Sequence, residues 1–152
     1  MTHNRTSGFH KSAFDGATLL KLDIMRHYVR EWLPVFLSKR SRPCVNVFDF
    51  FAGPGADALG NPGTPLIILG ELRKYWQTRP VDPSVKVSLY FSDRDRSHVA
   101  ELQARVEPFA RNQPWGVRVA KLDFGEAFNT YLPLIRDRNS ADLVILDQYG
   151  FQ

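Results

Sequence analysis

A single cysteine, Cys44, is present among the 152 residues, so no disulfide can form within the chain. Chains without disulfides are typical of reducing compartments, which predicts a cytoplasmic location. No stretch approaches the roughly 18 consecutive apolar residues of a membrane helix. Residues 1–8 are polar, unlike a secretory signal. We therefore expect no membrane partner.

The four histidines are scattered without the short spacings of metal ligands, so no metal site is expected. The net charge of +4 permits a nucleic-acid partner but does not require one. The densest basic stretch, residues 39–42, fits either a solvated turn after a helix or a contact to phosphate. With 43% hydrophobic residues, the chain has the composition of one ordinary globular domain.

Hydrophobic periodicity divides the chain into a flexible N-terminus, residues 1–15, and one domain, residues 16–152. Apolar residues at helical spacing predict a long first helix that Thr18 could cap, with a kink or an end near Pro34. Short apolar runs then alternate with helical patterns. The predicted strands are residues 44–50, 85–91, 117–122 and 142–146, and the predicted helices between them are residues 64–76, 96–110 and 127–135. This order, a helix and then βαβαβαβ, predicts an α/β fold with a Rossmann-like parallel sheet.

The first predicted strand ends in a segment suited to holding a ligand. Asp49 comes at its end, and Gly53, Pro54 and Gly55 follow as a sharp turn. Ligands of open α/β sheets bind at the carboxyl ends of the strands. Residues 56–63 are rich in glycine and proline and predict a loop, after which Thr64 and Pro65 read as a cap and a first helical residue.

Each predicted strand carries an aspartate at or just beyond its carboxyl end: Asp49, Asp93, Asp123 and Asp147. Any one of them could simply cap the helix that follows. Four together at the edge of the binding crevice favour a ligand with amine and hydroxyl donors.

Gly53, Gly55 and Ala58 also match a dinucleotide fingerprint. In that motif the helix starts at the glycines, and an acid that binds the ribose follows about 20 residues on. Here the glycine and proline residues at 60–63 delay the start of the helix. Asp93 lies much further along the chain than the ribose-binding acid of the motif, and the carboxylate of Asp49 would face the diphosphate. A cationic cofactor therefore suits the site better than a nicotinamide dinucleotide.

The segment from Asp49 to Gly55 resembles motif I of class I S-adenosylmethionine-dependent methyltransferases. Over residues 18–152 the chain is similar, more narrowly, to the three-Cys-motif partner protein family. The similarity is carried by Lys21, Tyr28 and Trp32, by Phe-Ala-Gly-Pro-Gly at 51–55, Pro-Gly-Thr-Pro-Leu at 62–66, Ser-Asp-Arg-Asp at 92–95 and Leu-Asp-Gln-Tyr-Gly at 146–150. The glycine turn followed by the Pro-Gly-Thr-Pro helix start is its most specific part.

The resemblance implies S-adenosylmethionine as cofactor, methyl transfer, and a partner protein with a three-cysteine motif. It implies cofactor-binding roles for Asp49 (amino group), Phe51, Ala52, Gly53 and Gly55 (methionine end), Asp93 (ribose), Asp123 (adenine amine) and Phe124 (adenine ring). Asp147 and Tyr149 would stand in the substrate pocket as the catalytic residues.

Two alternatives to a methyltransferase of unspecified substrate stay open. The chain could be a non-catalytic partner that keeps the fold as a binding module. It could also methylate nucleic-acid amines, because Asp147-Gln148-Tyr149-Gly150 is similar to the Asp-Pro-Pro-Tyr motif of amino methyltransferases. It departs from that motif at Gln148, and Tyr149 falls one place early.

The methyltransferase fold has further strands after the fourth. Without them the fourth strand would leave an apolar edge exposed. We therefore expect the 152 residues to be the amino-terminal part of an incomplete fold.

Overall fold

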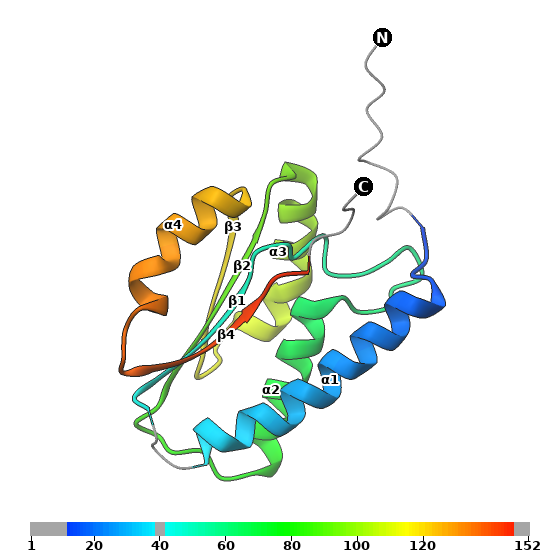
Figure 1. Cartoon of the computed structure of the whole chain (residues 1–152). Coiled ribbons are helices and arrows are strands. Elements are labelled where there is room, and N and C mark those ends of the chain that lie inside the picture. Colours follow the sequence, from blue (N-terminus) through cyan, green and yellow to red (C-terminus); the bar gives the residue numbers. More distant parts are fainter. Residues whose placement is uncertain (1–11, 39–41, 148–152) are drawn as a thin grey trace.

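The computed structural model describes residues 12–38 and 42–147 (Figure 1). Within them a first helix is followed by alternating strands and helices, which confirms the predicted order. The elements are α1 (Gly16–Leu37), β1 (Cys44–Asp49), α2 (Thr64–Thr78), β2 (Lys86–Asp93), α3 (Arg96–Ala110), β3 (Gly116–Lys121), α4 (Phe124–Ile135) and β4 (Ser140–Ile145). Across these residues, no helix combines the length and apolar character that crossing a membrane requires.

The strands form one parallel sheet in the order β3-β2-β1-β4. This is the order of the first four strands of a Rossmann sheet. β3 lies at an edge, which fits its polar sequence with Arg118 and Lys121. β4 is the other edge within the described residues. The chain builds outward from β1 through β2 to β3 and then returns to β4 on the opposite side of β1. The strand order therefore reverses between β1 and β4, where ligands of such sheets bind.

Helices cover both faces of the sheet, with α4 on one face and α1, α2 and α3 on the other (Figure 1). Side chains alternate between the faces along each strand. Val47, Leu89 and Phe91 pack in the larger core beneath α2 and α3. Phe48 packs beneath α4 with Tyr131. β1 is thus buried on both sides, whereas β2 alternates between buried residues on one face and exposed or half-buried residues on the other.

Two helix starts differ from the sequence-based expectation by a short distance. Asp15, not Thr18, caps α1, and its carboxylate accepts a hydrogen bond of 2.7 Å from the Thr18 backbone N–H. Gly63 is the cap residue of α2, so Thr64 is the first helical residue. α1 continues through Pro34 and ends at Leu37, close to the predicted end.

A charged pair fixes α1 across α2. Arg30 donates two hydrogen bonds, of 2.9 and 3.1 Å, to the two carboxylate oxygens of Glu71. Glu71 is buried, and the hydrogen bonds from Arg30 lower the pKa of its carboxyl despite that burial. Bidentate pairs of this kind fix orientation as well as contributing energy. They hold α1, and Lys21 with it, in a defined place relative to the strand ends.

Candidate functional site

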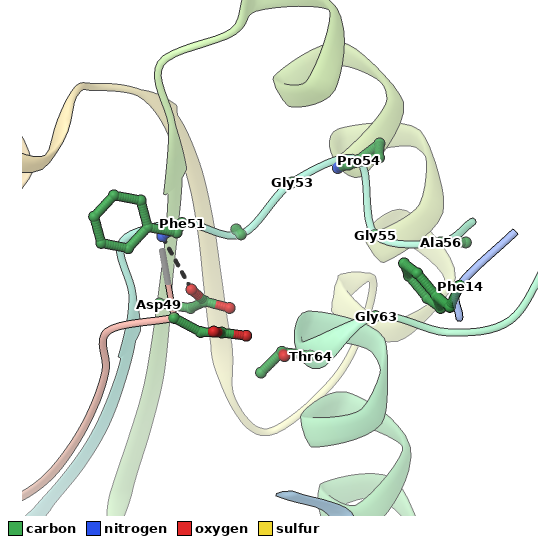
Figure 2. Close-up of a pocket in the computed structure, with 11 residues that line it drawn as sticks. Phe14, Asp49, Phe51, Gly53, Pro54, Gly55, Ala56, Gly63 and Thr64 are labelled. Carbon is green, nitrogen blue, oxygen red and sulfur yellow. Dashed lines mark hydrogen bonds between the residues drawn. The ribbon is translucent and has the colours of Figure 1, made fainter. Parts of the chain in front are cut away.

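A cavity opens at the carboxyl end of β1, where the strand order reverses (Figure 2). Six of the predicted site residues come together around it. Its lining comprises Phe14, Asp49, Phe51, Ala52, Gly53, Pro54, Gly55, Ala56, Gly63, Thr64 and Asp147. The cavity measures about 20 Å³, which is room for about one water molecule. One end of a larger ligand could enter it, while the rest would lie along the strand ends.

The glycine turn forms the wall of this cavity. Gly53 and Gly55 have positive φ angles of 63° and 91°, which glycine adopts without steric cost. A Cβ atom at Gly55 would lie 2.9 Å from Cδ1 of Leu102, so α3 packs directly against the turn. The Gly63 N–H donates a hydrogen bond of 2.8 Å to the Gly55 carbonyl. The turn is therefore held from two sides.

Asp49 is the most deeply buried acid at the cavity, with 2% of its surface exposed. One carboxylate oxygen accepts a hydrogen bond of 3.1 Å from the Phe51 N–H. The other has no hydrogen-bond partner among the described residues. Burial raises the pKa of Asp49 to about 7, and the nearby charges of Asp147 and Asp93 act in the same direction. An ammonium group that met the second oxygen would relieve this cost.

Asp93 connects the glycine turn to β2. Its Oδ2 accepts a hydrogen bond of 3.0 Å from the Gly53 N–H, and its Oδ1 accepts one of 2.8 Å from the Asp95 N–H. Nδ1 of His98 lies 3.3 Å from the same Oδ1. A carboxylate has about four acceptor positions, so Oδ2 can accept a further hydrogen bond. Asp93 does not line the cavity itself but fixes its wall.

Asp147 follows β4 and forms an ion pair with Lys21 of α1, with 2.7 Å between Nζ and Oδ2. The two residues also line a larger groove of about 280 Å³ between α1 and β4. Thr64 and Asp147 border both the cavity and the groove. The two spaces are therefore neighbours, with Asp147 between them.

The other two predicted cofactor residues lie beside β3 and do not line the cavity. Asp123 caps α4: its Oδ1 accepts a hydrogen bond of 2.8 Å from the Glu126 N–H, and Glu126 returns one of 2.9 Å. Asp123 therefore has the helix-capping role that the sequence allowed for each aspartate at a strand end. Phe124 stacks on Phe51 with ring centroids 5.6 Å apart and is 42% exposed. It reaches the cavity lining only through Phe51.

Asp57 and Phe14 are site residues that the sequence interpretation did not single out. Asp57 lies in a loop whose ends are joined by a bridge between Ala56 and Pro62. Its carboxylate accepts hydrogen bonds of 2.8–2.9 Å from the N–H groups of Phe14, Leu59 and Asn61 and from the Asn61 side chain. Burial opposes ionisation, but these hydrogen bonds hold the pKa of Asp57 at about 2. Aspartate close to Asn-Pro-Gly is a signal of such a turn.

Tyr149, the second predicted catalytic residue, lies outside the described residues, as do residues 39–41 of the basic stretch. Across 12–38 and 42–147, no group of three or more histidine, cysteine and acidic side chains is arranged to hold a metal ion.

Comparison with known proteins finds no matching family model and no matching curated protein. A solved structure described as "Loganic acid methyltransferase with SAH" matches at 13% identity with a TM-score of 0.44. The strand order of this chain is by itself that of a Rossmann-like α/β fold. The match covers 76% of this chain and 32% of that one, so the chain spans about a third of its neighbour's length. A likeness with this TM-score carries no argument about this chain, and the three-Cys-motif partner family stays a prediction.

Proposed function

We propose that the chain binds S-adenosylmethionine at the carboxyl ends of β1 and β2 and belongs to a methyltransferase of the three-Cys-motif partner type. The observation that carries this proposal is Asp49. It is a buried carboxylate beside a glycine turn, and it presents an oxygen without a described partner where the strand order reverses. Such a group suits the ammonium of a cationic ligand.

The arrangement of charges favours this cofactor over a dinucleotide. A pyrophosphate would need the first turn of a helix at the glycines. Here α2 starts at Thr64, after the loop, and the carboxylates of Asp49 and Asp147 face the cavity instead. A diphosphate placed there would meet negative charge, whereas a cation would neutralise it.

Each residue would have a distinct part in holding the cofactor. Asp49 would accept from the amino group, and the glycine turn would let the methionine end approach the backbone. Asp93 has acceptor capacity left on Oδ2 for a ribose hydroxyl. Phe124, half exposed beside Phe51, would offer a face to the adenine ring, and Asp123 would lie near its amine. A bound sulfonium supplies an activated methyl group, so the protein mainly has to orient the acceptor and exclude water.

The ion pair at Asp147 favours a second candidate function. Lys21, with its Nζ 2.7 Å from Oδ2, already occupies one oxygen of Asp147 and would compete with an amine acceptor for this carboxylate. A non-catalytic module that binds the cofactor and a partner protein would tolerate this pairing. A screen for transfer of radiolabelled methyl groups to DNA, RNA and protein separates the two candidates, because the module transfers nothing.

Titration calorimetry with S-adenosylmethionine and its demethylated product tests the proposal. We expect the wild type to bind both, and Asp93→Asn to bind at least about tenfold more weakly, because a charged acceptor is lost. Glu107→Gln removes a charge from an exposed part of α3 and is the matched control, with unchanged affinity. The proposal fails if the wild type binds neither compound, or if Asp93→Asn binds like the control.

A further inference from the structure

The residues just before α1 lie against the loop that follows the glycine turn. The Phe14 N–H donates a hydrogen bond of 2.8 Å to Oδ2 of Asp57. The Ala58 N–H donates one of 3.4 Å to the Ser12 carbonyl. Two segments that are 43 residues apart in the sequence are thereby joined at the cavity.

The two oxygens of Asp57 serve different segments. Oδ1 accepts from the N–H groups of Leu59 and Asn61, and these bonds close the loop itself. Oδ2 accepts from the Asn61 side chain and from the Phe14 backbone. Asp57 is only 4% exposed, so these bonds are sheltered from water. The bonds to Oδ1 close the loop, whereas the bond from Phe14 to Oδ2 fixes the segment before α1, which lies outside the loop.

Phe14, whose backbone is held by this bond, also lines the cavity. Figure 2 shows its ring beside Gly55, Ala56 and Gly63, with Thr64 between it and Asp49. The cavity thus has an aromatic wall at one end and a buried carboxylate at the other. This combination suits an organic cation, because the carboxylate meets its charge and an aromatic face attracts cations while covering apolar atoms.

We infer that Asp57 is a positioning residue that places Phe14 as a wall of the cofactor cavity, and that Phe14 strengthens binding of the cofactor. The inference rests on the proposed function, since the ligand it concerns is S-adenosylmethionine or its demethylated product. Phe14 is the group that contacts the ligand, and Asp57 acts through it.

Calorimetry on the wild type, Phe14→Ala, Asp57→Asn and the double variant, with Phe14→Tyr and Leu59→Ala as controls, tests this inference with the demethylated product as the probe. We expect Phe14→Ala and Asp57→Asn each to weaken binding about tenfold. The double variant should bind no more weakly than the weaker single variant, because Asp57 acts only through Phe14. Phe14→Tyr keeps the ring and should bind within about twofold of the wild type. Leu59→Ala, a 76% exposed side chain on the same loop, should match the wild type.

The outcomes separate this inference from the proposal on which it rests. If the wild type binds neither compound, the proposed function fails and the inference fails with it. If the wild type binds and Phe14→Ala binds equally well, the inference alone is overturned. Additive losses in the double variant would also overturn it, because they would show that Asp57 acts independently of Phe14. The comparison of Phe14→Ala with Leu59→Ala decides the role of the wall even if Asp57→Asn does not fold.

Discussion

The Asp49→Asn variant is expected to be more stable than the wild type at pH 8, by up to about 4 kcal/mol in the free energy of unfolding. Burial raises the pKa of Asp49 from 3.8 to about 7. In the unfolded chain the carboxyl loses its proton near pH 4, while in the folded chain it keeps the proton until about pH 7. Folding therefore becomes less favourable as the pH rises through this window, and the penalty is complete above pH 7.

Urea unfolding at pH 5 and pH 8 measures the effect. The gain from Asp49→Asn should be about 1.5 kcal/mol at pH 5, less than half its full value, and should approach that full value at pH 8. Asparagine keeps an oxygen that can accept from the Phe51 N–H, so the local hydrogen bond survives. Glu107→Gln, at an exposed carboxylate, should show no comparable gain at either pH. An equal difference at both pH values would contradict the assignment of the penalty to Asp49.

The same variant is expected to lose affinity for S-adenosylmethionine, because it removes the charge that would meet the ammonium. A substitution that raises stability and lowers affinity would show that the buried charge of Asp49 destabilises the fold but is needed to bind the ligand.

Gly55→Ala is expected to destabilise the fold by about 3 kcal/mol, from backbone strain and overpacking together. The φ angle of 91° disfavours a side chain, and the new Cβ would approach Cδ1 of Leu102 to 2.9 Å. Leu102 is fully buried in α3, so it has little room to withdraw. Either the turn or α3 must shift, and both border the cavity.

Gly70→Ala is the matched control for this substitution. Gly70 lies within α2. Apart from its neighbours in the chain and the nearby backbone of the same helix, no atom lies within 4 Å of a Cβ placed there. Alanine favours a helix over glycine, so a gain of about 1 kcal/mol is expected. Thermal or urea unfolding of both variants measures the difference. Equal effects at the two positions would show that the turn at Gly55 is not constrained as described.

The order of the elements could be predicted because each strand is short and apolar and is separated by clear breakers. β1 is buried on both faces, whereas Lys86 and Ser88 alternate with buried apolar residues in β2, and the edge strand β3 carries Arg118 and Lys121. The placement of Asp49 and the glycine turn followed from the same logic, since a strand end in a parallel sheet leaves little choice of position.

Contacts between segments that are distant in the chain could not be predicted from the sequence. Nothing near Asp57 shows that its second oxygen would bind the backbone of Phe14. The ion pair between Lys21 and Asp147 depends on how α1 lies relative to β4, which periodicity does not determine. The cap at Asp123 was readable, because Glu126 three residues later completes a capping box. Asp123 could equally have capped the helix or accepted from the adenine amine, and the sequence did not decide between these two roles.

The position of β1 between β2 and β4 has a consequence for how the molecule forms. The first strand in the chain pairs on one side with β4, in a register that joins Cys44 to Ser140 and Asp49 to Ile145. During synthesis this pairing has to wait until β4 has been made, and closing such a long loop is slow. The surroundings of Asp49 are therefore completed late, when β4 docks and brings Asp147 to Lys21.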